Sequence, residues 1–228
     1  MHRKRLSTPR TIKIPRKTKK WLVTTSPGPH NKEAVPLLVI VRDFLELADT
    51  AREAKRIISA GEVLVDGVKR KDYRFPVGLF DVVTIPKINK SYRILFDEKG
   101  RYIPKEIDDD NLKLYRITGK TIVKGGKEQL HLFDGTNILA SGFSVKDSIL
   151  MKIPEKEIVE HLKFEEGALV MITGGTHAGE MGKLKKYREM RGASPNLVTV
   201  EGDRKEYTTI EDYVFVVGKD KPVIDLGV

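Results

Sequence analysis

The order of apolar and polar positions predicts two short helices early in the chain and strands in most of the remainder. Residues 37–47 are crowded with large aliphatic side chains, and only Arg42, Asp43 and Glu46 are polar among them. This pattern predicts a first helix that ends near Ala48.

A second helix is predicted to begin at Thr50. The segment from Thr50 to Glu53 has the spacing of a capping box, in which the Thr50 hydroxyl accepts from the Glu53 amide and the Glu53 carboxylate accepts from the Thr50 amide. Gly61 is expected to end the helix. One helix face is apolar, and the opposite face carries Arg52, Lys55, Arg56 and Ser59.

Short β-branched runs after this helix predict a small sheet. The strands are expected at 63–65, 68–73 and 79–85, with a hairpin turn at Asp66-Gly67 and an end at Pro86. Together with the helices they form a unit of about fifty residues, a typical minimal domain.

Residues 87–163 show no helical period, so we expect a central β domain there. Its predicted strands are 92–96, 112–120, 121–123, 128–133 and 137–139. Five further runs with glycine turns follow Gly167 and are typical of a compact barrel: 168–173, 182–190, 197–201, 206–209 and 213–217. The fold class is therefore α+β, mostly β.

Positive charge is concentrated at the N-terminus. Residues 1–36 hold ten of the 42 Lys and Arg residues and a single carboxylate, Glu33, whereas the remaining chain is nearly neutral. Such an arm buries little, so we expect it to be disordered until a polyanion, by default a nucleic acid, neutralises it. Its predicted contacts are Arg3, Lys4, Arg5, Arg10, Lys13, Arg16, Lys17, Lys19 and Lys20.

Other destinations for a basic arm are disfavoured. Pro9 and Pro15 interrupt the amphipathic helix of a mitochondrial transit peptide, and Trp21 has no apolar face around it for membrane binding. The aliphatic run 37–41 is too short to span a bilayer. The lack of cysteine fits a reducing cytosol and excludes disulfides and thiolate metal sites. We expect a soluble cytoplasmic protein.

The sequence contains no catalytic constellation. The glycine-rich stretch 174–182 lacks the Gly-Lys-Ser/Thr of a Walker loop, and the five histidines have no metal-ligand spacing. The acidic triplet 108–110 is a weak magnesium candidate and is more typical of a solvated turn. These absences favour a protein without a cofactor, metal or small-molecule substrate, and the family resemblance described below implies that it has no enzymatic activity.

The segment from Thr50 to Arg70 resembles the alpha-L, or S-four, RNA-binding motif. The motif begins with a small residue followed by Arg, Glu, Ala and a basic residue, as in 51–55 of this chain. Aliphatic residues, a glycine, a strand, a turn and a basic strand then follow in the order of the motif. The resemblance implies that Thr50, Arg52, Lys55 and the basic strand lie against folded RNA. We place Arg42, Arg56, Lys69 and Arg70 on the same predicted surface.

The segment 167–184 resembles the KOW motif of SH3-like barrels at Val170, Gly174, Gly179, Gly182 and Lys183, with Glu180 where a base is common. Gly174, Gly175, Gly179 and Lys183 are candidate contacts with an RNA backbone, although the glycines can equally serve the turn alone. Three further candidates have two interpretations each. His177 can hydrogen-bond or stack with RNA, or satisfy its own loop, and Lys124 and Lys127 can contact a phosphate or serve only the hairpin. Trp21 can stack on a base, but docking of the arm is slightly favoured.

Taken in order, the whole chain resembles archaeal and eukaryotic small-subunit ribosomal proteins of the S-four-e family. Segments 134–139, 158–162, 195–199 and 213–218 extend the resemblance. It implies a structural role in translation, in the small ribosomal subunit, with small-subunit rRNA and neighbouring ribosomal proteins as partners and without homo-oligomers. The predicted parts are a basic extension (1–36), the alpha-L domain (37–88), the central β domain (89–164) and the KOW domain (165–228).

A different class of function also fits some of these motifs. Alpha-L and KOW segments occur in RNA-modifying enzymes and in RNA-binding factors that act transiently on ribosomal or transfer RNA. A catalytic domain would separate these classes, and about eighty residues of weakly patterned β structure leave little room for one.

Overall fold

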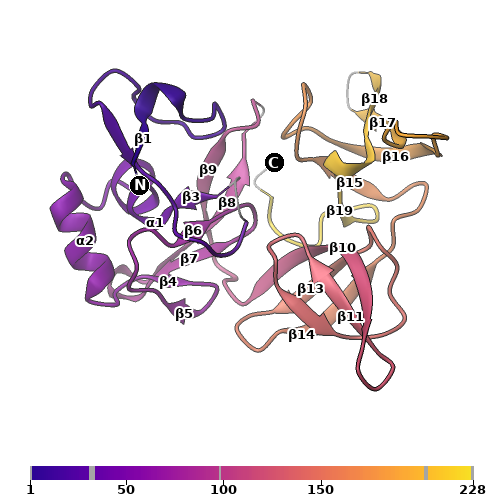
Figure 1. Ribbon diagram of the computed structural model, residues 1–228, viewed down its shortest axis with the longest axis horizontal. Helices are drawn as coiled ribbons and strands as arrows, with labels where there is room; N and C mark the ends of the chain where they lie inside the picture. Colours follow the sequence, from indigo (N-terminus) through magenta and orange to yellow (C-terminus); the bar gives the residue numbers. More distant parts are fainter. Residues whose placement is uncertain (1, 31–33, 98, 203–204, 227–228) are drawn as a thin grey trace. The chain divides into compact units, whose positions relative to one another are not determined.

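The computed structural model of the protein describes residues 2–30, 34–97, 99–202 and 205–226 (Figure 1). The chain is mostly β, as predicted, and divides into two compact units. Unit 1 comprises Met1–Leu95, Arg101–Lys113 and Lys152–Lys156, and unit 2 comprises Phe96–Gly100, Leu114–Met151 and Glu157–Val228. Over the described residues, every helix is too short or too polar to cross a bilayer.

The N-terminal arm is folded, which corrects the expectation of disorder. Strand β1 (His2–Lys4) pairs antiparallel with β2 (Trp21–Val23), and the short helix η1 (Arg5–Ser7) follows β1. Ile12, Ile14 and Leu22 are buried. The expectation of disorder rested on repulsion between the basic side chains. Burial of these three apolar side chains favours a folded arm in spite of that repulsion.

The first helix differs from its prediction. It begins as α1 (Leu37–Val39) and continues as the π-helix η3 (Ile40–Phe44), so it stops short of Ala48. The Leu45 amide donates to the Ile40 carbonyl at 2.9 Å, the wider spacing of a π-turn. Residues 37–41 are all buried, so packing on every side, rather than one amphipathic face, sets the local geometry.

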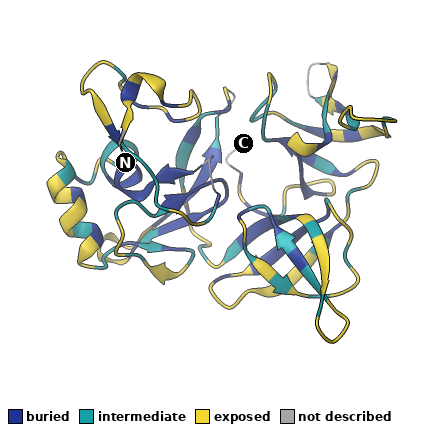
Figure 2. Cartoon of the chain, viewed as in Figure 1, coloured by how far each residue is buried: buried dark blue, intermediate teal, exposed yellow. Residues whose placement is uncertain are grey.

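The second helix, α2 (Ala51–Ser59), matches its prediction. The Glu53 amide donates to Thr50 Oγ1 and the Thr50 amide donates to Glu53 Oε2, both at 3.2 Å, which completes the capping box. Ala54 and Ile58 are buried, whereas the opposite face is exposed (Figure 2).

Unit 1 is built on a five-stranded sheet in the order β5-β4-β7-β8-β9. Its strands are β4 (Leu64–Val65), β5 (Val68–Lys69), β7 (Val82–Ile85), β8 (Lys90–Phe96) and β9 (Tyr102–Ile107), and the helix η4 (Pro86–Ile88) precedes β8. A separate pair joins β3 (Val35–Pro36) to β6 (Pro76–Val77).

Two features of this sheet were predicted differently. The strand expected over 68–73 is only two residues long, because the chain bends into a turn in which the Phe75 amide donates to the Asp72 carbonyl. Strand β9 was not predicted. The sheet also continues past residue 88, and the domain limits at 36, 88 and 164 stay predictions.

The first sheet of unit 2 has the order β12-β11-β10-β13-β14. Its strands are β10 (Leu112–Val123), β11 (Lys127–Leu132), β12 (Asn137–Leu139), β13 (Ser148–Lys152) and β14 (Glu157–Leu162), and β10 begins in unit 1. Tyr115, Leu130 and Met151 are among the residues of its core. The two strands predicted at 112–120 and 121–123 form a single strand, β10. Strands β13 and β14 were not predicted.

The second sheet of unit 2 has the order β18-β17-β16-β15-β19. All five of its strands were predicted: β15 (Leu169–Ile172), β16 (Met181–Arg188), β17 (Leu197–Gly202), β18 (Glu206–Ile210) and β19 (Val214–Gly218), with the helix η5 (Glu211–Tyr213) before the last. Strand β19 returns to pair with β15, an order consistent with the expected barrel.

Candidate nucleic-acid interface

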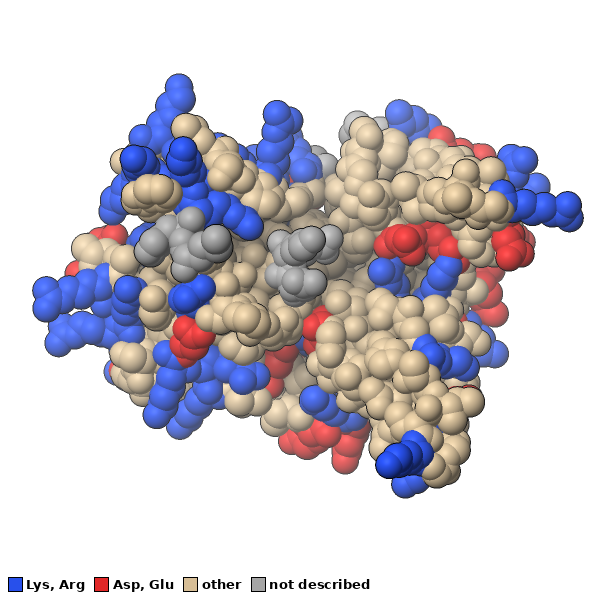
Figure 3. Space-filling model, in the orientation of Figure 1, with Lys and Arg blue, Asp and Glu red and all other residues tan. Residues whose placement is uncertain are grey.

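Most predicted cations of the arm are exposed: Arg3, Lys4, Arg10, Lys13, Lys17, Lys19 and Lys20. In Figure 3, Lys and Arg side chains gather over the arm and over α2. Lys4, Lys17, Lys19 and Lys20 line a hollow of about 480 Å³ together with Leu6, Arg16 and Thr18. The folded arm therefore presents its charge in a defined concave site.

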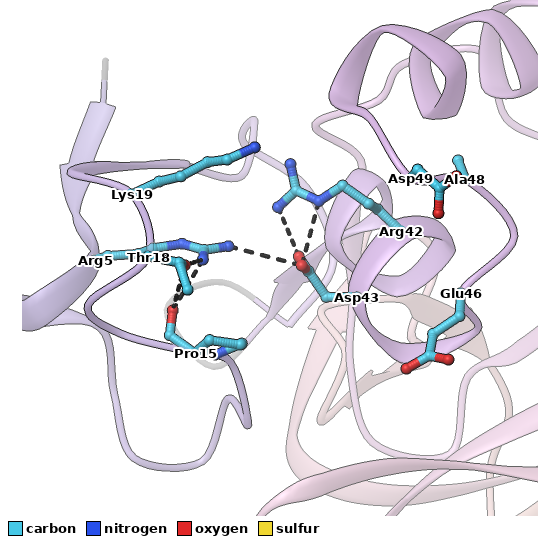
Figure 4. Close-up of a pocket in the computed structure, with 9 residues that line it drawn as sticks. All are labelled: Arg5, Pro15, Thr18, Lys19, Arg42, Asp43, Glu46, Ala48 and Asp49. Carbon is cyan, nitrogen blue, oxygen red and sulfur yellow. Dashed lines mark hydrogen bonds and ion pairs between the residues drawn. The ribbon is translucent and has the colours of Figure 1, made fainter.

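Two arginines of the arm serve its folding instead. Arg5 is buried, and its guanidinium donates to the Pro15 carbonyl at 2.9 Å and to Thr18 Oγ1 at 2.7 Å, and lies 3.7 Å from Asp43 Oδ1 (Figure 4). The half-buried Arg16 donates to the Thr8 carbonyl at 2.7 Å. Its burial makes Arg5 a weaker candidate for an RNA contact than the exposed cations of the arm, and that contact stays a prediction.

The hollow between the arm and η3 has mixed charge. It measures about 350 Å³ and is lined by Arg5, Lys19, Arg42, Asp43 and Glu46, among others (Figure 4). Arg42 donates to both carboxylate oxygens of Asp43, at 3.2 and 2.7 Å, so its charge is compensated locally. Arg42 is therefore a weaker candidate for a phosphate contact than the exposed lysines of the arm.

Helix α2 presents the second group of cations. Arg52, Lys55 and Arg56 are exposed, as predicted for this face, and Lys69 is exposed on β5. The Thr50 hydroxyl accepts the capping bond, and its own proton remains available to a ligand. Together these side chains make the α2 surface, which we define as Thr50, Arg52, Lys55, Arg56, Lys69 and Arg70.

Aromatic rings position two members of the α2 surface. The Lys55 ammonium lies 4.3 Å from the centroid of the Tyr73 ring, and the Arg70 guanidinium lies 4.3 Å from that of Phe75. Arg70 Nε is buried and has no hydrogen-bond partner among the described residues. Sequence reasoning missed both rings, although they lie within five residues of Arg70.

Hydrogen bonds fix the arm to the part of unit 1 that carries α2. Arg74 Nε donates to the Thr24 carbonyl at 3.0 Å, and the Ser26 amide donates to the Arg74 carbonyl at 2.9 Å. The Ser26 hydroxyl donates to Asp72 Oδ2 at 2.8 Å. The two cationic groups therefore belong to one compact body rather than to a separate tether and a domain.

A buried ionic cluster underlies this body. Asp81 Oδ1 lies 2.8 Å from His30 Nε2 and 2.5 Å from Lys113 Nζ, and Lys113 Nζ also lies 2.6 Å from Asp66 Oδ2. Burial alone would raise the pKa of Asp81, but the charges of His30 and Lys113 outweigh it and hold that pKa well below its usual value. Burial raises the pKa of Asp66, against the opposing effect of Lys113.

The predicted contacts in the glycine-rich loop of unit 2 are engaged within the protein. The His177 ring stacks on Tyr207 at 4.1 Å, and its Nδ1 lies 3.1 Å from Glu180 Oε2. Lys183 Nζ is 3.0 Å from Asp220 Oδ1. A Cβ on Gly174 would come within 2.7 Å of the Tyr213 ring, so this glycine has a packing role.

Gly175 and Gly179 adopt positive φ angles of 81° and 92°, as the turn requires. At the tip of the β10–β11 hairpin, Lys124 and Lys127 are exposed, and the glycines between them have open space around them. These two lysines remain available for a phosphate contact.

Sequence reasoning missed a third group of cations in unit 2. Lys186 and Arg188 on β16, and Arg191 just after it, are exposed and have no ion-pair partner among the described residues. Lys185, between Lys183 and Lys186, instead pairs with Glu206. The basic run 185–188 is visible in the sequence, where it is predicted only as part of a strand. We call Lys186, Arg188 and Arg191 the β16 surface.

Residues of the acidic triplet 108–110 accept hydrogen bonds from neighbouring strands of the protein. Asp110 Oδ2 accepts from Ser91 Oγ at 2.9 Å, and the Asp109 carbonyl accepts from Arg93 at 3.2 Å. Among the described residues, no three His, Asp or Glu side chains come together as metal ligands would.

Comparisons with known proteins agree with this arrangement. Three family models match consecutive segments: the RS4NT (NUC023) domain at residues 1–33, the S4 domain at 35–83 and Ribosomal family S4e at 88–158. The small ribosomal subunit protein eS4 of Archaeoglobus fulgidus is 75% identical over 232 residues, which cover 100% of this chain and 99% of the relative.

The eS4 protein of Methanothermobacter thermautotrophicus is 50% identical over 99% of this chain and 95% of its own. Among solved structures, the crystal structure of the 30S ribosomal protein S4e from Thermoplasma acidophilum matches with a TM-score of 0.71 and 31% identity. The match covers 83% of this chain and 97% of that one.

Proposed function

Because the chain belongs to Ribosomal family S4e, we propose that it is a structural, non-enzymatic constituent of the small ribosomal subunit that binds ribosomal RNA. This is the S-four-e family that the sequence was expected to belong to, so that prediction is confirmed. Within the subunit its partners are the rRNA and neighbouring ribosomal proteins. We keep the prediction that the protein forms no homo-oligomers as part of this proposal.

One observation carries the proposed mode of binding: unit 1 holds two exposed cationic groups, the arm and the α2 surface, on one body. Lysine and arginine side chains that neutralise phosphates release counterions, and this release drives binding to nucleic acids without regard to sequence. The contacts therefore position the protein along the RNA backbone rather than select bases.

The proposed interface is narrower than the predicted list. It contains the exposed arm cations, the α2 surface, the lysines at 124 and 127 and the β16 surface. It leaves out Arg5, which is buried. Arg42, His177 and Lys183 are weaker candidates for RNA contacts, because each side chain already interacts with a carboxylate of the protein.

Sucrose-gradient sedimentation of cell extracts tests the role in the subunit. A structural constituent should co-migrate with small subunits even after high-salt washes that remove transient factors. The purified protein, sedimented without ribosomes, should behave as a monomer. A pool that is free or released by the wash would contradict the structural role. Mapping RNA–peptide crosslinks across the assembled subunit then tests the interface residue by residue.

A further inference from the structure

Trp21 is the only tryptophan of the chain, and 51% of its surface is exposed on strand β2. A large aromatic ring that stays half in solvent on a folded segment is unusual, since such rings normally contribute their area to a core. The sequence left two roles open for Trp21, docking of the arm or stacking on a base. The next residue, Leu22, is buried in the folded arm, whereas about half of the Trp21 side chain stays accessible to a ligand.

The surroundings of the ring are cationic. Lys4 lies directly opposite Trp21 in the β1–β2 register, so the two side chains share one face of the ribbon. The Lys20 ammonium lies 5.2 Å from the centroid of the Trp21 ring. Lys4 and Lys20 also line the 480 Å³ hollow of the arm. An aromatic platform thus adjoins a basic concavity.

Resting on the proposed function, we propose that Trp21 stacks on an unpaired base of the RNA while Lys4 and Lys20 bind the phosphates beside it. Every base has a π face, so an aromatic platform beside cations accepts single strands of varied sequence. A duplex keeps its bases stacked on one another and does not offer such a face. The arm therefore recognises an unpaired nucleotide, in addition to backbone charge.

A lipid surface is the other class of partner that an exposed tryptophan among lysines can meet. Interfacial binding needs a broad apolar face, and within the described part of the arm the only other exposed large apolar side chain is Leu6. The observations therefore favour RNA, and the experiment below includes vesicles.

Because the chain has a single tryptophan, the emission of the unmodified protein reports on this site alone. Full-length protein is titrated with single-stranded oligouridine and with an RNA duplex of equal charge, and binding is followed separately by the anisotropy of labelled RNA. We expect the single strand to quench the emission and to shield Trp21 from acrylamide. We expect the duplex to bind with little quenching.

Variants give a second, independent readout. Trp21→Ala is expected to weaken single-strand binding about five- to 150-fold, the equivalent of about 1–3 kcal/mol per stacked base. Its slope of log affinity against log salt should not change, because stacking releases no counterions. Trp21→Phe should restore most of the affinity and Trp21→Leu should not. Ile122→Ala is the control, because it removes an apolar side chain from β10 that is even more exposed, at 78% against 51% for Trp21.

The outcomes separate this inference from the proposed function. If labelled single strands bind while the emission stays constant, or if the duplex quenches as strongly, the stacking role is wrong and the proposed function stands. An emission change with phosphatidylserine vesicles but none with RNA also overturns the inference. If no RNA binds at low ionic strength, the proposed function itself fails.

Discussion

Lys113 and Asp81 form an ion pair in which Nζ lies 2.5 Å from Oδ1, and each side chain is only 1% exposed. The pair joins the start of β10 to the turn before β7, and His30 binds the same carboxylate oxygen from the linker that follows the arm. Because all three groups are buried, each depends on the others for compensation of its charge or polarity.

Lys113→Met should therefore destabilise the protein strongly. Removing one partner leaves the Asp81 carboxylate with less compensation, and breaking a buried pair in this way costs about 3–5 kcal/mol of the free energy of unfolding. Urea unfolding followed by far-UV circular dichroism measures the change. Lys90→Met is the control, because the pair of Lys90 with Glu106 is exposed and its loss should hardly move the midpoint. Equal effects of the two variants would contradict the assigned role of burial.

Stability should also fall in acid through Asp81. The folded-state pKa of this group is lowered, so its contribution is present above the unfolded-state pKa, near 3.8, and is lost as the pH falls toward the lower folded-state pKa. We expect Asp81→Asn to be less stable than the unmodified protein at pH 7 and to show a flatter dependence of stability between about pH 2 and 4. Parallel curves for the two proteins would refute this account.

Arg5→Gln should open the arm without a direct effect on RNA contacts. The substitution removes charged hydrogen bonds to the Pro15 carbonyl and Thr18, each worth about 1.5–3 kcal/mol. The loss of one such bond should make trypsin cleavage within residues 10–20 about 10- to 150-fold faster, and the loss of both faster still, provided that cleavage occurs from the open state. Arg3→Gln, at an exposed arginine of the same arm, should leave the cleavage rate unchanged.

Neutralising the arm lysines should change the salt dependence of RNA binding. The triple variant Lys17→Gln, Lys19→Gln and Lys20→Gln removes three exposed charges, so the slope of log affinity against log salt should become shallower by about 2. Filter binding at several salt concentrations measures the slope. Lys87→Gln with Lys90→Gln removes lysines that are already paired with Glu62 and Glu106, and the slope should change less.

The β16 surface makes the same test possible in unit 2. Lys186→Gln, Arg188→Gln and Arg191→Gln should together weaken RNA binding and remove crosslinks from residues 185–192. Lys183→Gln with Lys185→Gln is the matched control on the same strand, since Asp220 and Glu206 already pair with those lysines. If the control variant weakens binding as much as the triple variant, free charge is not what distinguishes the β16 surface.

The elements that were predicted correctly are those with local causes. The capping box at Thr50 and the left-handed Gly61 act within a few residues, so α2 follows from the sequence alone. The strands of the second sheet of unit 2 carry regular alternation and glycine turns, which are local signals too.

The elements that were missed depend on distant partners. The arm is held by the bonds of Arg5 to residues ten and thirteen positions away, which charge counting does not register. The π-helix Ile40–Phe44 depends on burial from all sides. Strand β9 contains Pro104, which lowers its strand propensity, and it lies at the sheet edge where such a residue is tolerated.

The same distinction applies to the candidate site. Sequence reasoning found the exposed cations of the arm and α2, but it could not separate them from Arg5 and Lys183, whose partners are far along the chain. It missed the rings of Tyr73 and Phe75 because cation–π contacts need a turn that brings them beneath Lys55 and Arg70.

Strand β7 pairs with β4 on one side and with β8 on the other. Strands of the segment matched by the S4 model therefore share one sheet with β8 and β9, which lie in the segment matched by the S4e model. Severing the chain at residue 88 would bare the β8-facing edge of β7, inviting strand-to-strand aggregation of the fragment. A recombinant fragment meant to isolate this sheet should extend at least through Lys113, which completes strand β9 and keeps the buried partner of Asp81.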